Sequence, residues 1–284
     1  MSVCLAYDGS TNADWVAHYA VRLAAGHPDR KLRILHVETA EFPTAQLSDK
    51  LANIGIIAEK AGVAAEVEIC PMRDGVVGGL IDHVGEDPTA LMVCGVRVRG
   101  GRRGFLEDTV TWQLLRDTSF DVVAFRVVQP GGLGVVRRLL MPVAGHKPGH
   151  RAAIKVLELM ANYLKELRLL HVVELPAPKL RRLQAPNAEA LRLQATAYLR
   201  EIEDNLRADP VLQGVSLETA VRISDDWARE AIIDGAQQHA DLICIEAARS
   251  SLEKGFRYGD PFETLLRDAA SDVAIYRGGV HNGR

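Results

Sequence analysis

Short apolar runs alternate with amphipathic stretches along the first half of the chain. The first of these runs, Val3–Tyr7, is short and unbroken, which is typical of a strand buried on both faces. The predicted strands are Val3–Tyr7, Leu32–Val37, Ala65–Cys70, Ala90–Cys94 and Val122–Phe125. The stretches between them predict helices after a cap at Ser10 or Thr11 and over about 45–61, 74–84 and 109–116. This alternation predicts βαβ units and a mostly parallel sheet.

The same pattern begins again after a glycine-proline break at Gln129–Gly134. Three later segments repeat earlier ones in the same order: Leu167–Val172 repeats Leu32–Val37, Leu265–Asp268 repeats Leu114–Asp117, and Asp272–Arg277 repeats Asp121–Arg126. The second copy is longer, mainly because helical spacing continues over about 191–206. The sequence therefore predicts a duplicated α/β unit, with domains at 1–129 and 136–279.

Composition indicates the general class of protein but not its function. The chain has 284 residues, 48% of them hydrophobic and 25% charged, which is ordinary for globular proteins. A net charge of −3 gives no reason to expect nucleic acid, and no apolar run approaches the roughly 20 residues of a membrane helix. The four cysteines have no C-x-x-C spacing and are expected to be buried, reduced thiols. We expect a cytoplasmic protein with no nucleic-acid or membrane partner.

The stretch with the clearest chemistry follows the fourth predicted strand. The apolar run ends at Gly95, passes through a loop rich in arginine and glycine, and enters a helix near Thr109. Loop backbone, guanidinium groups and helix N-terminal N–H groups can all bind one phosphate. This layout is that of an anion site; the alternative is an exposed loop whose arginines only keep it solvated.

The Tyr7–Ser10 turn, the Leu35–Val37 strand and this glycine loop together resemble the universal stress protein family, and the resemblance covers both halves. It implies an α/β fold of two doubly wound, five-stranded parallel-sheet domains in tandem, Rossmann-like with strand order 3-2-1-4-5. It also implies an internal pseudo-dimer in which Val122–Val127 pairs with Asp272–Arg277, protecting the sheet edges. A homodimer of whole chains is left open.

Members of this family that bind ATP use a G-x-x-G-x9-G-(S/T) loop together with an aspartate after the first strand. In the first half, Gly95 and Thr109 match this motif, whereas Val98 and Asp108 replace its second and third glycines. Valine resists the positive φ that glycine allows, and a carboxylate competes with phosphate for helix N–H groups. The residues expected to contact ATP or ADP are Ala6, Asp8, Gly9, Val37, Gly95, Arg97, Arg99, Gly100 and Thr109.

The second half departs further from the motif. Ala144 stands in the place of Asp8, Glu246 in the place of Gly95, and Arg249 in the place of the second glycine. Gly259 keeps the third glycine, but Asp260 replaces the hydroxyl residue. We expect this half to be a structural or regulatory copy.

Two functions fit these patterns. The first is a stress-response protein with at most one degenerate ATP or ADP site, in the first half; the second is a nucleotide-free interaction module. No catalytic residue is predicted, because the chain has neither a Walker-type lysine nor an S-G-G-x-D-S loop, so ATP hydrolysis is at most slow. No metal site is predicted, since His146 and His150 have no third ligand nearby in sequence, and His36 and His171 are expected to be structural.

Overall fold

The computed structural model describes residues 2–38, 47–85, 87, 89–96, 109–143, 154–247 and 260–279. Its first half contains β1 (Val3–Ala6), α1 (Thr11–Gly26), β2 (Lys31–Val37), α2 (Ser48–Lys60), β3 (Ala64–Cys70), α3 (Gly75–Val84), β4 (Leu91–Gly95), α4 (Val110–Asp117) and β5 (Asp121–Arg126). A short 3-10 turn at Pro130–Gly132 follows, within the predicted glycine-proline break.

The second half repeats this order of elements. It contains β6 (Arg138–Val143), α5 (Ile154–Met160), β7 (Glu166–Glu174), α6 (Ala177–Leu180), α7 (Ala185–Arg207), β8 (Ser216–Ser224), α8 (Trp227–Gln237), β9 (Leu242–Glu246), α10 (Pro261–Asp268) and β10 (Asp272–Arg277). A 3-10 turn at Pro210–Leu212 precedes β8.

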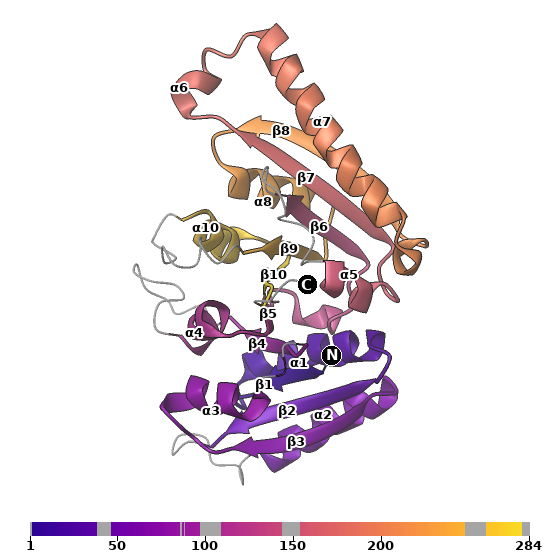
Figure 1. Ribbon diagram of the computed structural model, residues 1–284, viewed down its shortest axis with the longest axis vertical. Helices are drawn as coiled ribbons and strands as arrows, with labels where there is room; N and C mark the ends of the chain where they lie inside the picture. The colour runs from indigo at the N-terminus through magenta and orange to yellow at the C-terminus, as the bar shows by residue number, and fades with distance from the viewer. Residues whose placement is uncertain are drawn as a thin grey trace.

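All of these strands form one ten-stranded sheet in the order β3-β2-β1-β4-β5-β10-β9-β6-β7-β8 (Figure 1). Each half is parallel and has the order 3-2-1-4-5, so the predicted fold class is confirmed. The halves join where β5 and β10 pair antiparallel, with Phe125 opposite Ala274. The predicted pairing of the last strands is therefore present, and β3 and β8 are the two outer strands.

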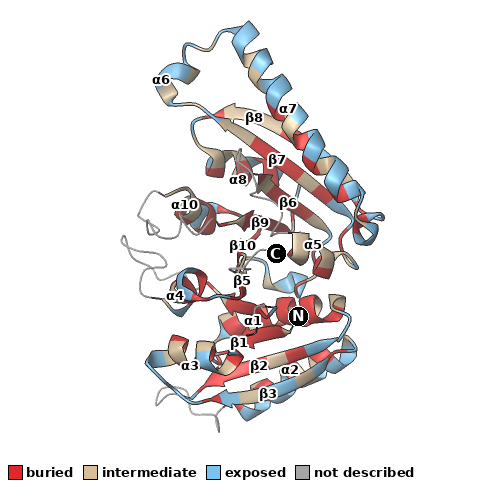
Figure 2. Cartoon of the chain, viewed as in Figure 1, coloured by how far each residue is buried: buried red, intermediate tan, exposed pale blue. Residues whose placement is uncertain are grey.

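Helices cover both faces of this sheet, and each face has a core that runs through both halves. One core contains the buried sides of α1, α2, α5 and α7, and the other contains those of α3, α4, α8 and α10. Figure 2 shows the buried residues concentrated along the central strands and the inward sides of the helices. The two halves consequently share their hydrophobic cores.

Two arginines hold the junction in a pseudo-symmetric way. Arg126 ends β5 and donates from Nη1 to the carbonyl oxygen of Ala269, 3.1 Å away, at the C-terminus of α10. Arg277 ends β10 and donates from Nε to the carbonyl oxygen of Leu115 at 2.8 Å, in the last turn of α4. Each arginine thus satisfies carbonyl groups at the C-terminal end of a helix in the other half, where positive charge is favourable.

Two buried aspartates complete the same junction. Asp272 accepts hydrogen bonds from the backbone N–H of Val128 at 2.6 Å and from the hydroxyl of Tyr19 at 2.5 Å. Asp121, its counterpart in the repeat, accepts from the backbone N–H of Gly279 at 2.7 Å and from Lys155 Nζ at 3.1 Å. Burial and the Asp272 charge raise the pKa of Tyr19, whose ring stacks on Phe125 with centroids 4.3 Å apart.

The second half is larger because of α7. This helix has 23 residues, whereas α2, its counterpart, has 13. Its buried stripe of Ala195, Leu199, Ile202 and Leu206 lies in its C-terminal part. The N-terminal part of α7, together with α6, extends past the end of β8 (Figure 1).

An ion pair ties the outer strand β3 to β2 and gives a pH-dependent prediction. Arg33 Nε and Nη2 donate to the two oxygens of Glu68 at 2.7 and 2.8 Å, and His83 Nε2 lies 2.5 Å from Glu68 Oε2. Hydrogen bonding from Arg33 is the largest cause that lowers the pKa of Glu68 from 4.5 to about 2. Because the pKa of Glu68 is lower in the folded than in the unfolded protein, ionised Glu68 stabilises the folded state. This stabilisation is complete above pH 4.5 and is lost as the pH falls toward 2.

We therefore expect Glu68→Gln to reduce the free energy of unfolding by about 1–2 kcal/mol at pH 7, allowing for partial exposure of the pair. In urea titrations the difference from wild type should shrink below pH 4.5 and vanish near pH 2. Glu66→Gln is the matched control, because Glu66 is exposed on the same strand. An equal loss at pH 7 and pH 3 would contradict the assignment.

Candidate functional site

The candidate site lies at the carboxyl edge of the first half, where the strand order changes direction. β1 has β2 on one side and β4 on the other, so the strand ends at Ala6, Val37 and Gly95 are neighbours. In open α/β sheets, ligands bind beyond the strand ends at this point. Six of the predicted residues therefore lie at this edge: Ala6, Asp8, Gly9, Val37, Gly95 and Thr109. The other predicted residues, Arg97, Arg99 and Gly100, lie outside the described residues, as do Val98 and Asp108.

The turn after β1 presents an exposed carboxylate. Asp8 Oδ1 accepts a hydrogen bond from the backbone N–H of Ser10 at 2.9 Å, and Ser10 caps α1 by accepting from Ala13 N–H at 3.2 Å. Gly9 has φ of +76°, and a Cβ there would also meet Leu47 Cδ2 at 2.3 Å. Glycine is required at this position for both reasons. The turn therefore holds the Asp8 carboxylate beyond the C-terminal end of β1, at the carboxyl edge of the sheet.

A hydrogen-bond network that was not predicted from the sequence supports this turn. Tyr7 donates its hydroxyl to Asp14 Oδ1 at 2.5 Å, while Lys50 Nζ donates to Asp14 Oδ2 and to the carbonyl oxygen of Gly9, both at 2.7 Å. Burial, followed by the bond to Asp14, raises the pKa of Tyr7. Lys50 comes from α2 and belongs to no motif, so only the packing of α2 beside α1 reveals it.

Gly95 is constrained by its neighbours as well as by any ligand. A Cβ on Gly95 would lie 2.4 Å from Asn12 Nδ2, on the first turn of α1. The Thr111 hydroxyl donates to the Gly95 carbonyl oxygen at 2.7 Å, which joins the start of α4 to the end of β4. Thr109 caps α4 by accepting from Trp112 N–H at 3.1 Å. The match of Gly95 and Thr109 to the loop motif thus has a packing explanation too.

The second half keeps the scaffold of this edge but changes its chemistry. His171 Nδ1 donates to the carbonyl oxygen of Val143 at 2.9 Å, just as His36 Nδ1 donates to that of Tyr7 at 2.9 Å. Both histidines are buried and hydrogen-bonded to a backbone carbonyl, as is expected of structural histidines. Glu246 ends β9 where Gly95 ends β4, and Asp260 caps α10 by accepting from Phe262 N–H at 2.9 Å. Ala144, His146, His150, Arg249 and Gly259 lie outside the described residues.

Two further properties bear on function. The four cysteines are free and buried, as predicted, and burial raises the pKa of Cys94 and Cys244 to about 12. Among the described residues there is no group of three potential ligands that could hold a metal ion. In that same part of the chain, no helix has both the length and the apolar character needed to cross a membrane.

Solved structures with the same fold cover nearly the whole chain. A universal stress protein from Archaeoglobus fulgidus DSM 4304 is 18% identical, with 98% of each chain covered and a TM-score of 0.65. A putative universal stress protein from Pseudomonas aeruginosa UCBPP-PA14 is 13% identical, with 97% of this chain and 92% of that chain covered and a TM-score of 0.61. The cytoplasmic domain of a prokaryotic cation chloride cotransporter is 14% identical, covers 99% of this chain and 96% of its own, and has a TM-score of 0.63. At these identities the likeness establishes the fold alone.

The family is identified from the sequence. No curated protein matches the chain at a significant level. The model of the universal stress protein family matches residues 136–277, which is half of the chain and the half with the more altered loop. The first half repeats the fold of that matched half, strand for strand. The chain belongs to the universal stress protein family.

Proposed function

We propose that this protein is a stress-response regulator with one adenine-nucleotide site, for ATP or ADP, at the carboxyl edge of the first half. The observation that carries the proposal is the exposed Asp8 carboxylate, which follows β1, the neighbour of the strand that ends at Gly95, and is held by a turn that Tyr7, Asp14 and Lys50 support. A carboxylate in this position can accept hydrogen bonds from ribose hydroxyls or an exocyclic amine. The proposal assigns a binding role and no catalytic residue.

The proposal places no nucleotide in the second half. Glu246 is only partly exposed and ends the strand where phosphate would approach. Two unit charges of the same sign at 4 Å repel by about 1 kcal/mol in water, and by about 4 kcal/mol near a protein surface. A carboxylate there opposes a triphosphate, so we expect a stoichiometry of one.

We expect isothermal titration calorimetry to give one saturable site for ATP or ADP, and Asp8→Ala to weaken it at least tenfold. One lost hydrogen bond to a charged group is worth about 1.5–3 kcal/mol, which corresponds to that factor or more. Asp209→Ala is the control, because Asp209 Oδ1 makes the same kind of local bond, to Val211 N–H at 2.9 Å, in the second half. Two sites per chain, or equal affinities in both variants, would contradict the proposal.

One observation favours the alternative, a nucleotide-free interaction module. The Asn12 amide is so close to Gly95 that it occupies the space beside the strand end. If it excludes phosphate, the wild-type protein should show no thermal shift at millimolar ATP, while Asn12→Ala should gain one. A shift already present in the wild type, and unchanged in Asn12→Ala, rules this reading out.

A further inference from the structure

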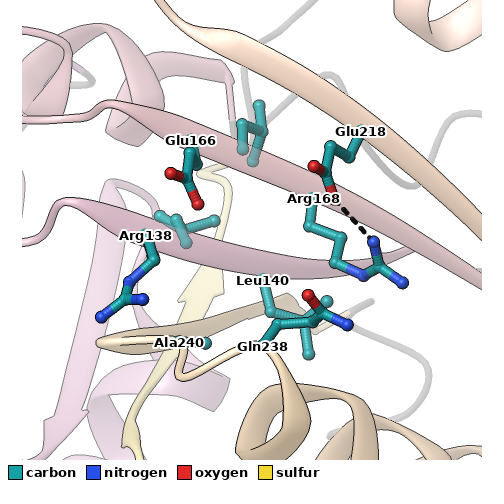
Figure 3. Close-up of a pocket in the computed structure, with 9 residues that line it drawn as sticks. Arg138, Leu140, Glu166, Arg168, Glu218, Gln238 and Ala240 are labelled. Atoms are coloured by element: carbon teal, nitrogen blue, oxygen red, sulfur yellow. Dashed lines mark hydrogen bonds and ion pairs between the residues drawn. The ribbon is translucent and has the colours of Figure 1, made fainter.

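A small polar hollow lies at the opposite edge of the second half, away from the candidate nucleotide site. It is lined by the first residues of β6 and β7, by Glu218 of β8, and by the turn between α8 and β9 (Figure 3). Its volume is about 50 Å³. A buried water needs roughly 10–15 Å³ of such space, so the hollow accommodates about four water-sized groups.

Two of the four charges around this hollow neutralise each other. Arg168 Nη1 donates to Glu218 Oε2 at 2.7 Å, the contact drawn as a dashed line in Figure 3. The Nε of Arg168 also donates to Asp234 Oδ2 at 2.6 Å, and Asp234 is buried. Arg168 is therefore fixed in place and its charge is balanced.

The other two charges are opposite in sign and are not engaged with each other. Arg138 and Glu166 are register partners on the neighbouring parallel strands β6 and β7. Neighbouring strands are about 4.8 Å apart, so the two side chains start side by side. Within the described residues, neither the Arg138 guanidinium nor the Glu166 carboxylate has an ion pair or side-chain hydrogen bond, and Figure 3 draws no contact between them.

The rest of the lining is apolar or neutral. Leu140 and Ala240 provide apolar atoms, and the Gln238 side chain, which can donate and accept hydrogen bonds, extends toward Arg168 (Figure 3). An anion here would meet Glu166, and a cation would meet Arg138. A ligand that carries both charges on adjacent groups avoids both penalties.

We propose that this hollow binds a small zwitterion, an α-amino acid of about the size of glycine or alanine. Its carboxylate pairs with Arg138 in the planar, two-point geometry that guanidinium favours, and its ammonium group pairs with Glu166. A short side chain rests on Leu140 and Ala240. The site is independent of the proposed nucleotide site.

The first half has no equivalent of this pair, which makes the site specific to the second half. By position in the repeated sheet, Ser2 stands in the place of Arg138 and Lys31 in the place of Glu166. The exposed Lys31 is therefore the position for a matched control variant.

Calorimetric titration of the full chain with glycine, L-alanine, acetate and methylammonium tests the proposal. We expect saturable binding of glycine or L-alanine, at least tenfold weaker binding of acetate and methylammonium, and at least a tenfold loss in both Arg138→Gln and Glu166→Gln. Lys31→Gln should bind as the wild type does. Circular dichroism of each variant separates a lost site from a lost fold.

Each contrary result has a definite meaning. If acetate binds as tightly as L-alanine and only Arg138→Gln weakens it, the hollow is a simple anion site and the proposal is wrong. The proposal is also wrong if neither amino acid binds at a concentration ten times a millimolar Kd. It is wrong too if the Arg138→Gln and Glu166→Gln variants are folded and bind as the wild type does.

Discussion

Replacing Asp272 with alanine is expected to lower the free energy of unfolding by about 4 kcal/mol. This carboxylate is 3% exposed and accepts from Val128 N–H at 2.6 Å, Gln129 N–H at 2.8 Å and the Tyr19 hydroxyl at 2.5 Å. The substitution leaves these donors without their acceptor; the buried Tyr19 hydroxyl alone costs about 1–3 kcal/mol, and the two partly buried backbone N–H groups add to this. Chemical denaturation followed by circular dichroism measures the loss.

The pseudo-symmetric counterpart provides the control. Asp121→Ala removes bonds to Gly279 N–H at 2.7 Å and to Lys155 Nζ at 3.1 Å, and the Lys155 side chain is 39% exposed. Water can solvate that lysine after the change, so we expect about half the loss. Tyr19→Phe, which removes one donor and keeps the stacking on Phe125, should cost about 1–2 kcal/mol. A larger effect from Asp121→Ala than from Asp272→Ala would show that the junction is organised differently.

The fold was predictable because the pattern that specifies it is local and is repeated. The unbroken apolar runs predicted buried strands, and β1, β4 and β5 are buried along almost their whole length, whereas the outer strand β3 is largely exposed. The repeat of Asp121–Arg126 in Asp272–Arg277 identified the two strands that meet at the junction. Periodicity also gave the long second-half helix, whose buried positions are Ala195, Leu199, Ile202 and Leu206.

The chemistry of the sites was less predictable because it depends on contacts between distant residues. Asp8 and Gly95 could be selected from a motif, whereas Lys50 reaches the Gly9 carbonyl only because α2 packs beside α1. The helix predicted from residue 74 instead begins at Gly75, after Asp74 in a left-handed conformation with φ of 47°. The Arg138–Glu166 pair follows from strand register, which no single-segment pattern reveals. The same holds for the side-chain contacts across the junction, such as that of Arg126 with the Ala269 carbonyl oxygen.

Gly26, the last residue of α1, shows how closely the two halves are packed. A Cβ at this position would lie 1.9 Å from the carbonyl oxygen of Leu159 in α5, an atom of the backbone that cannot rotate away. We expect Gly26→Ala to reduce the free energy of unfolding by about 3 kcal/mol, because α1 and α5 must separate to admit one methyl group. The measurement is equilibrium denaturation of the whole chain.

Gly55 in α2 offers a control with the opposite sign. No atom lies within 4 Å of a Cβ built there, so alanine meets no obstacle. Because glycine in a helix interior is less favourable than alanine by about 0.5–1 kcal/mol, Gly55→Ala should stabilise the protein by that amount. If both variants were stabilised, α1 and α5 would not be in contact in solution. If only Gly26→Ala is destabilised, α1 and α5 are in contact in solution. Because the two halves also share their hydrophobic cores, a chain cut between them should not fold as two independent domains.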